Sequence, residues 1–470
     1  MIAFLPITSM PLVSRILGSD SVASPSILFL FLFLCLWIVG FFLKGNAFIR
    51  KSEPLALFFL WSILVTLLSQ FRNTPPFKDI GYIYPAVTGI STLAIGILFF
   101  ISASSYPDNI LVKKKALQII NWSGLMIISW SSLQALSWYT MTGYPDWMFN
   151  LQGIWSSRVL FRQRVTGFAL EPSWLAHQLN MLYLPFWLAS ARNRYSSHEF
   201  RIFGFTFESV LLVFGIAVLG LTLSRVGYAA FLFMLFPTII YFHKQIIKSV
   251  SKKGNDGERK VDLSSRMVST ALIISYIFLI AAGLYVYSRI DPRMAELFDF
   301  SFQESNSLLR YFNELKFGDR VVYWLTGWNI FNDFPFAGVG LGNAGFYFPD
   351  YLPPYGWALS EARRLIYRTG ILLNIKSLWF RLLAETGIIG FGLFITWLLS
   401  LIPELIEKVK AKQKMINIIG TAGFYVLLAM IFEGFSIDSF AMPYWWISLG
   451  LAVSIHGREI NIEIEPGKNK

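Results

Sequence analysis

Three arginines gather just ahead of an apolar segment of the chain. Arg158, Arg162 and Arg164 fall within seven residues. Glu171 and Pro172 then lead into an apolar run with helical spacing. A guanidinium forms paired hydrogen bonds to phosphate, and a helix that begins at proline offers free N–H groups and partial positive charge to an anion. The stretch therefore predicts a phosphate-binding site to which all three arginines contribute.

The apolar run itself carries polar side chains on one helical face. Ser173, His177 and Asn180 are spaced at i, i+4 and i+7, which places them on the same side of a helix. Polar groups within a membrane span usually face the bundle interior or a wet cavity. Glu171 and His177 are the candidate general bases of such a site. A purely structural, hydrogen-bonded His177 is the favoured alternative.

Arg225 follows Ser224 in the short connection of the stretch LTLSRVGYAAF, between two apolar runs. The short backbone on both sides holds its guanidinium at the membrane boundary. Spacing alone leaves two interpretations open. Arg225 binds an anion, or it anchors the hairpin at the interface by extending its charged end into water.

Arg320 stands near the start of a further stretch with helical spacing, GDRVVYWLTGWNIFND. We expect a helix from about Asp319 to Asn332, with Asp319 as its N-cap. The Gly- and Pro-rich stretch at 335–356 then predicts a structured loop. Because it follows no strand, a dinucleotide-binding fingerprint is excluded. Its glycines would let the backbone approach a ligand closely; they are Gly338, Gly340 and Gly342.

Five cations precede the next apolar run and make its mouth a further candidate for phosphate binding. They are Arg363, Arg364, Arg368, Lys376 and Arg381. Glu385 lies four residues after Arg381. On a helix this spacing brings the two side chains together, so we expect an ion pair there in preference to a catalytic base.

No spacing of residues indicates a resident metal or cofactor. Cys35 is the only cysteine, which excludes intrachain disulfides. The sequence contains no HExxH motif, no paired carboxylate motif and no phosphate-binding P-loop. We therefore expect neither a metal nor a cofactor.

The elements that position these residues are membrane helices. Hydrophobic residues make up 55% of the 470 and charged residues only 14%, which excludes a water-soluble globular protein. Apolar runs long enough to cross a hydrocarbon core recur along the chain, and residues 1–25 could hold a further short helix. We predict an all-α integral membrane protein with about eleven (ten to twelve) transmembrane helices, near residues 26–43, 55–70, 85–102, 117–138, 173–190, 203–222, 226–243, 268–288, 382–402, 416–434 and 441–455.

Basic residues are concentrated in alternate connections, and the positive-inside rule assigns those to the cytoplasm. Loops 44–54, 103–115, 191–202, 244–267 and 403–415 carry 3, 3, 3, 7 and 4 basic residues. The N-terminus is then expected outside and the C-terminus inside, with segments 71–84, 139–172 and 289–381 on the external face. The net charge of +12 follows from this topology and needs no nucleic-acid partner.

The external segments differ from the internal loops in the kind of basic residue. The internal loops hold 14 Lys and 6 Arg, whereas the external segments, counted together with Arg15 of the N-terminal stretch and Arg225 of the short connection, hold 3 Lys and 14 Arg. The positive-inside rule does not distinguish the two residues, so it does not explain this difference. The external face is expected to bind phosphate, unless its arginines merely pair with the nine acidic residues of the long loop.

The long external segment divides the chain into three parts. Residues 1–288 form an N-terminal bundle of transmembrane helices, and residues 289–381 form a large external loop with two or three short helices. Residues 382–470 contribute the last transmembrane helices and a cytoplasmic tail. A connection this long inside a compact bundle is usually functional.

Four stretches resemble, in order and spacing, the O-antigen ligase and polymerase superfamily of bacterial inner-membrane glycosyltransferases. They are RVTGFALEPSWLAHQL, LTLSRVGYAAF, DRVVYWLTGWNIFNDFPFAGVGLGN and KSLWFRLLAETGIIGFGLF, within roughly residues 160 to 400. The resemblance implies a GT-C-like fold and a glycan donor on undecaprenyl pyrophosphate. External arginines of the family act on that pyrophosphate. The matching positions are Arg164, Arg225 and Arg320, and with Glu171 and His177 they form our set of catalytic candidates.

This chain departs from the family's pattern at one position that bears on the reaction. Ligase members carry a histidine eight or nine residues before the ETG-like motif, where this chain has Lys376. Surrounding phosphates would keep that lysine protonated, so we expect it to bind pyrophosphate, and the polymerase is favoured over the ligase. The other pyrophosphate-binding candidates are Arg158, Arg162, Arg363, Arg364, Arg368 and Arg381.

The prediction is a surface-polysaccharide (O-antigen) polymerase in the bacterial inner membrane. It joins undecaprenyl-pyrophosphate-linked repeat units by metal-independent, inverting transfer at the periplasmic face. Its partners are lipid-linked oligosaccharides and membrane lipids, with a chain-length regulator and a flippase as further candidates. A ligase acting on lipid A core or on protein is the nearest alternative. A transporter or flippase of the lipid-linked unit is the alternative of another class; it predicts polar breaks deep in several spans, and only Glu208 and Glu433 stand out.

Overall fold

The computed structural model describes residues 1–18, 23–43, 52–105, 109–141, 143–253, 258–290 and 318–454. Within these ranges almost all of the regular secondary structure is helical. The only sheet there is a hairpin in which β1 (Arg201–Ile202) pairs antiparallel with β2 (Phe205–Thr206). Five of the described helices are long and apolar enough to cross a membrane. The prediction of an all-α membrane protein is confirmed.

Each of the eleven predicted spans overlaps a helix, although only five of the described helices are long and apolar enough to cross a membrane. The span near 173–190 is built from α7, a π-helical turn η4 and α8, the span near 203–222 begins in the β1–β2 hairpin and continues on α9, and each of the others overlaps a single helix. These elements are α2 (Pro25–Leu43), α3 (Glu53–Ser69), α4 (Ile83–Ser105), α5 (Ile110–Met141), α7 (Pro172–Gln178), η4 (Leu179–Tyr183), α8 (Leu184–Arg192), α9 (Phe207–Leu221), α10 (Arg225–Lys253), α11 (Glu258–Ile290), α17 (Leu378–Val409), α18 (Lys414–Glu433) and α19 (Pro443–Ala452).

Short helices accompany the long ones. The first 25 residues contain η1 (Ile2–Phe4) and α1 (Pro11–Leu17), so a short helix does lie ahead of the first predicted span. The connection between α5 and α7 contains α6 (Asp146–Trp155).

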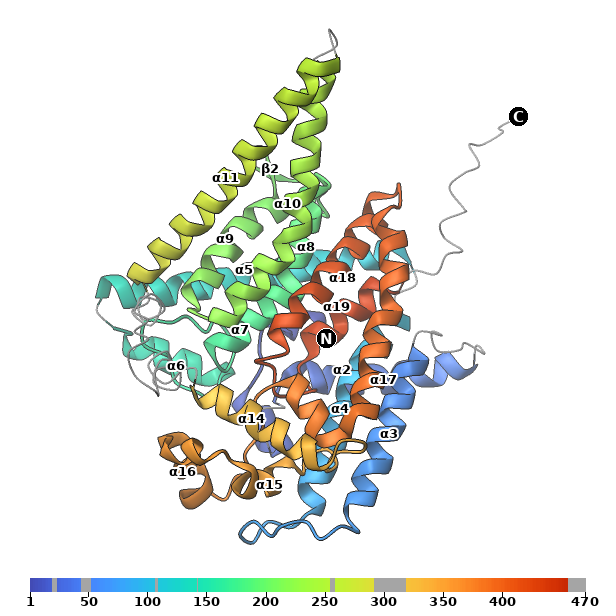
Figure 1. Ribbon diagram of the computed structural model, residues 1–470, viewed down its shortest axis with the longest axis vertical. Helices are drawn as coiled ribbons and strands as arrows, with labels where there is room; N and C mark the ends of the chain where they lie inside the picture. The colour runs from blue at the N-terminus through green and yellow to red at the C-terminus, as the bar shows by residue number, and fades with distance from the viewer. Residues whose placement is uncertain are drawn as a thin grey trace.

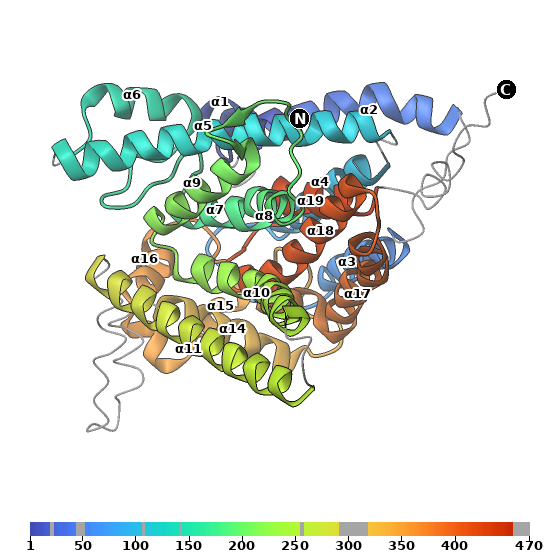
Figure 2. The same cartoon turned by 90° about the horizontal axis from the view of Figure 1, so that it is seen from above.

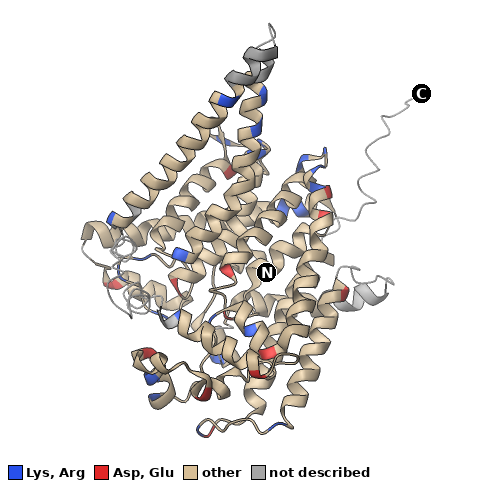
Figure 3. Cartoon of the chain, viewed as in Figure 1, with Lys and Arg blue, Asp and Glu red and all other residues tan. Residues whose placement is uncertain are grey.

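The connections between long helices lie at two opposite ends of the molecule. The α17–α18 connection lies toward the upper end in Figure 1, as do the C-terminal half of α10 and the N-terminal half of α11, whereas the α3–α4 connection and the short helices α14, α15 and α16 lie at the lower end. Basic residues mark the upper ends of α10, α11, α17 and α18 (Figure 3). Which of the two ends faces the cytoplasm stays a prediction.

Helix α5 differs in direction from α10 and α17. Both views show it running across the direction of α10 and α17, along one flank of the molecule (Figures 1 and 2). It packs against α9.

The main core lies where α4, α17, α18 and α19 pack together. Large aromatic side chains fill it, because Trp397, Trp445 and Trp446 are all fully buried. The rings of Trp445 and Trp446 stack with centroids 3.8 Å apart, and Trp397 stacks on Trp446 at 5.2 Å. This aromatic packing fixes the helices whose ends carry the candidate site.

The described part of the long external segment folds into short helices, as predicted. They are α14 (Gly318–Asp333), α15 (Ala344–Tyr351), a 3-10 turn η6 (Pro354–Ala358) and α16 (Ser360–Arg368). The predicted helix 319–332 corresponds to α14. The predicted structured loop contains α15, which the sequence did not predict because Pro349 lies inside it. The expected helices ahead of Gly318 lie outside the described residues, as does the Asp319 side chain.

The glycine-rich segment after α14 docks into a break in α17. Gly387 interrupts α17 with φ 66° and ψ −173°, which releases backbone groups from the helical ladder. Val339 N donates to Ala384 O at 2.9 Å and Gly340 N donates to Glu385 O at 2.8 Å. On the far side of the break, Ile388 N donates to the carbonyl of Pro335 at 2.7 Å.

This junction explains the glycine spacing. Gly338 has φ +66°, and a Cβ placed there would lie 2.5 Å from the carbonyl carbon of Glu385. Only glycine accommodates both constraints. The close backbone approach predicted for a ligand is therefore made to α17 itself, and the GVGLGN and ETG motifs form one structural unit.

Candidate active site

The RVTG segment, Arg164–Gly167, lies against the hairpin between α9 and α10. Arg164 Nε donates to the carbonyl oxygen of Thr222 at 2.9 Å, and Nη2 lies 3.4 Å from that of Leu223. These carbonyls follow the C-terminal end of α9, where backbone oxygens lack intrahelical partners and a cation is favoured. Arg164 therefore braces the turn that carries Arg225, and the two arginines singled out by the sequence lie in adjacent segments.

A buried glutamine holds the same segment from the other side. Gln134 of α5 accepts hydrogen bonds from the backbone N–H groups of Thr166 and Gly167, at 2.9 and 3.0 Å. Gly167 adopts φ +55°, a conformation that glycine reaches without steric cost. Thr166 and Gln134 are fully buried. The segment is thus a rigid part of the bundle.

Helix α7 begins at Pro172, as predicted, with Glu171 in extended conformation at the N-cap. The Glu171 carboxylate forms an ion pair with Arg158 and accepts a hydrogen bond from Ser173 Oγ at 3.3 Å. Arg162 is exposed. The start of α7 is therefore occupied by the Glu171 carboxylate, and Arg158 is the arginine that balances its charge.

His177 is paired with a carboxylate that the sequence did not link to it. Its Nδ1 lies 2.5 Å from Glu433 Oε2 at the end of α18, and both side chains are fully buried. Asn180 Nδ2 donates to Glu433 Oε1 at 2.6 Å and to the carbonyl of Gly227 at 2.7 Å. Because Asn180 lies in the π-helical turn η4, these contacts join the α7–η4–α8 helix to α10 and α18. The predicted common face of His177 and Asn180 is present.

Arg320 projects from the first turn of α14 toward the segment between α18 and α19. Its Nη1 donates to Ser436 Oγ at 2.7 Å. Burial lowers the pKa of the Arg320 guanidinium, while the carboxylates of Asp438, Glu171 and Glu433 oppose that shift. A buried guanidinium near several carboxylates remains charged and electrostatically strong.

Asp438 is the acidic residue that the sequence analysis missed. It lies in the connection between α18 and α19, and its Oδ1 is shielded from solvent with no hydrogen-bond partner among the described residues. Burial raises the pKa of its carboxyl, with a further contribution from Glu171, whereas Arg381 and Arg320 lower it. Only the tertiary fold brings Asp438 near the arginines, since it follows the tenth predicted span.

Arg381 and Glu385 form the ion pair expected from their spacing. Arg381 Nε donates to Glu385 Oε2 at 2.8 Å, and its Nη1 donates to the backbone carbonyl of Asp438 at 2.6 Å. Lys376 also forms an ion pair, in which its Nζ lies 2.5 Å from Glu361 Oε1. The same ammonium lies 4.5 Å from the ring centre of Tyr323, one turn along α14 from Arg320.

The remaining predicted arginines lie apart from these contacts. Arg363, Arg364 and Arg368 are all exposed on α16, whose buried side chains are Ala362 and Ile366. Figure 1 shows α16 at the lower edge of the molecule. The structure does not bring these three arginines to the buried charges.

We call the residues that share this electrostatic environment the arginine–acid cluster: Arg320, Arg381, Glu171, Glu433 and Asp438. They come from α14, α17, the start of α7, the end of α18 and the following connection. Such a mixed cluster can bind an anion through the guanidiniums and transfer a proton through a carboxylate. Among the described residues, no group of three or more His, Cys, Asp or Glu side chains could hold a metal ion.

The fold and this cluster define a class: a multi-pass, all-α membrane protein in which guanidinium and carboxylate groups from distant parts of the chain lie close together. A family model matches the middle of the chain. Residues 210–395 match the model described as O-antigen ligase, which supports the resemblance to the O-antigen ligase/polymerase superfamily and a role in surface-polysaccharide biosynthesis. No curated protein sequence matches the chain.

The matched range covers only part of the candidate site. Of the arginine–acid cluster it contains Arg320 and Arg381; it also contains Arg225, and it ends before α18. Arg164, Glu171 and His177 precede it, and Glu433 and Asp438 follow it. These flanking residues join the site through their contacts in the fold.

Proposed function

We propose that the protein is a surface-polysaccharide polymerase of the bacterial inner membrane. It joins repeat units carried on undecaprenyl pyrophosphate, by metal-independent inverting transfer at the periplasmic face. The observation that carries the proposal is the position of Arg320. It is a half-buried guanidinium whose hydrogen bond goes to the neutral hydroxyl of Ser436, so it can exchange that partner for a phosphate oxygen.

The diphosphate of the donor binds to Arg320 and Arg225, with Arg381 and Lys376 at its edge. Arg164 acts as a positioning residue, because its guanidinium is engaged with the carbonyls of the turn that holds Arg225. The carboxylates keep the buried guanidiniums solvated and in place when no substrate is bound.

The transfer is a single displacement. A hydroxyl oxygen of the acceptor sugar attacks the anomeric carbon of the donor, and the bond from that carbon to the diphosphate oxygen breaks. The diphosphate leaves with the bonding electrons, and the hydroxyl proton passes to a base. Negative charge grows on the diphosphate as the bond breaks, so fixed guanidiniums stabilise the transition state more than the ground state.

Asp438 is the base that fits this arrangement best. Its Oδ1 has no hydrogen-bond partner among the described residues, and it lies near both cluster arginines. Both carboxylate oxygens of Glu171 are engaged, by Arg158 and Ser173. His177 is fully buried and bound to Glu433, which suits it to holding α7 against α18.

The ligase is the second candidate and differs only in its acceptor. The choice of polymerase rests on Lys376, which stands where ligase members carry a histidine. Lys376 pairs with Glu361, and a protonated lysine is no general base.

The test uses purified protein in lipid nanodiscs with lipid-linked single repeat units from the source strain. A polymerase converts them into a ladder of longer lipid-linked chains on a gel. Transfer to added lipid A core without lengthening would identify a ligase instead. Absence of both products, with a folded protein and intact substrate, would contradict glycosyl transfer.

A further inference from the structure

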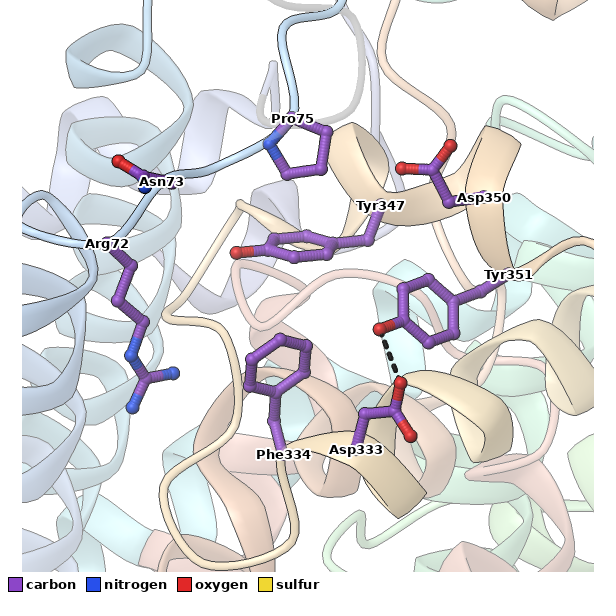
Figure 4. A pocket seen from close by; sticks show the side chains of 8 residues that line it. All are labelled: Arg72, Asn73, Pro75, Asp333, Phe334, Tyr347, Asp350 and Tyr351. Carbon is purple, nitrogen blue, oxygen red and sulfur yellow. Dashed lines mark hydrogen bonds between the residues drawn. The ribbon is translucent and has the colours of Figure 1, made fainter.

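A pocket of about 590 Å³ lies at the same end of the molecule as α14 and α15, away from the arginine–acid cluster. Three segments build its walls (Figure 4). They are the stretch after α3, the C-terminal end of α14 and the second half of α15. The lining residues are Arg72, Asn73, Pro75, Asp333, Phe334, Tyr347, Asp350 and Tyr351.

Contacts within the protein hold the pocket's side chains in place. Tyr351 Oη donates to Asp333 Oδ2 at 2.6 Å, and this contact is drawn in Figure 4. The rings of Phe334 and Tyr347 meet edge to face, with centroids 5.3 Å apart. Arg72 Nη1 donates to the carbonyl of Gly338 at 2.7 Å, which ties the pocket to the glycine-rich segment docked on α17. The walls are therefore formed before any ligand arrives.

The chemistry of the walls is mixed. Tyr347, Tyr351 and Phe334 offer aromatic surface, and a sugar ring has an apolar C–H face that can pack on it. The carboxylates of Asp333 and Asp350 can accept hydrogen bonds from paired hydroxyls, and Arg72 can donate to ring or hydroxyl oxygens. Two carboxylates against one guanidinium disfavour a phosphate, so the walls suit a sugar without an acidic group.

The length of α14 sets the distance between the pocket and the site of the proposed reaction. Arg320 and Asp333 stand near the two ends of α14, thirteen residues apart. At 1.5 Å of rise per residue they are separated by roughly 20 Å along the helix axis. A glycan whose diphosphate end lies at Arg320 would reach the pocket with a sugar several residues further along its chain.

We propose that this pocket is a saccharide-binding subsite that holds a distal sugar of the glycan while its other end reacts. The proposal rests on the proposed function, because that function supplies a glycan long enough to reach the pocket. The subsite would retain long chains and so favour their further growth.

The experiment measures binding alone, so it needs no catalytic turnover. The probe is the lipid-free saccharide released by mild acid from the surface glycan of the source strain. It is titrated into purified full-length protein in nanodiscs and followed by saturation-transfer NMR. The double variant Asp333→Asn, Asp350→Asn removes both carboxylate charges at two exposed positions. Asp79→Asn is the matched control, because Asp79 is an exposed carboxylate of the α3–α4 connection that does not line the pocket.

Wild-type protein and the control are expected to bind the saccharide equally, and the double variant at least tenfold more weakly. A milder variant, Tyr351→Phe, removes only the hydroxyl that orients Asp333 and should weaken binding about threefold. Equal binding by all variants, or no binding by the wild type, would overturn the subsite.

The outcome of this binding experiment can be told apart from the outcome of the ladder assay for the proposed function. Saccharide binding that depends on Asp333 and Asp350, in a protein that forms no ladder, would uphold the subsite and contradict the polymerase. A ladder without such binding would uphold the polymerase and contradict the subsite.

Discussion

The arginine–acid cluster and helix α16 hold arginines of the same sequence segment in opposite environments. Arg320 and Arg381 are largely withdrawn from water and lie among carboxylates from four parts of the chain. Arg363, Arg364 and Arg368 lie on the exposed face of one short helix. Screening by water weakens exposed charges, whereas buried guanidiniums act at close to full strength. Under the proposed function, this difference in exposure selects Arg320 and Arg381, and not the arginines of α16, as the side chains that contact the diphosphate.

The largest effect is expected at Asp438. Replacing it by asparagine removes the proposed base and should lower the rate of chain extension about 10²- to 10⁴-fold. The base works only when ionised, and burial raises the pKa of this carboxyl. Activity should therefore fall with decreasing pH earlier than for an ordinary aspartate, and this acid limb should vanish in Asp438→Asn.

The measurement is the initial rate of ladder formation in nanodiscs across a pH series, with Asp79→Asn as the control. A variant that keeps both the wild-type rate and the wild-type acid limb would move the role of base to Glu171 or His177.

The next effect is expected at Arg320. Substitution by alanine removes one charge donor from the leaving diphosphate, which is worth about 3 kcal/mol by comparison with the loss of a single oxyanion donor. The rate should fall about 10²-fold. Arg320→Lys should recover part of this loss, because an ammonium keeps the charge but not the paired hydrogen bonds. Single-turnover rates with lipid-linked units report the change, and an unaltered rate in Arg320→Ala would contradict the account.

A smaller effect, on stability, is expected at the break in α17, the helix that carries Arg381. Gly387→Ala forces a side chain into a left-handed conformation against the backbone of Phe336, which should cost about 2 kcal/mol or more. Gly392→Ala is the matched control, since a Cβ at this position of α17 meets no atom within 4 Å. Thermal unfolding in detergent should show a lower midpoint for the first variant and no decrease for the second.

The smallest effect is expected on α16. Replacing Arg363, Arg364 and Arg368 together by glutamine should change the rate less than threefold, because screened surface charges contribute little. A loss as large as that of Arg320→Ala would place the diphosphate at α16 and reverse the comparison.

The sequence predicted the helices well because the signal is local. A long apolar run needs only its own residues to identify it, and each predicted span overlaps a helix. The start of α7 at Pro172 and the pair formed by Arg381 and Glu385 also follow from short-range rules. Helix α15 was missed because Pro349 and the neighbouring glycines indicate a loop.

The site was predicted less completely, because its contacts join distant parts of the chain. The sequence drew attention to His177 and Glu433 separately, but 256 residues separate them and nothing local indicates their pairing. Asp438 was not predicted as a site residue, although an acidic residue directly after an apolar span is the signal that could have identified it. The three glycines were expected to approach a ligand, whereas Gly338 approaches the backbone of α17.

The most direct test of the central claim is the binding of undecaprenyl pyrophosphate itself. Native mass spectrometry of the purified protein can compare the wild type, Arg320→Gln and the triple glutamine variant of α16 at equal lipid concentration. We expect Arg320→Gln to bind the lipid at least tenfold more weakly, while the α16 variant stays within threefold of the wild type. Equal binding by wild type and Arg320→Gln, or a loss confined to the α16 variant, would contradict the claim that the buried cluster holds the diphosphate.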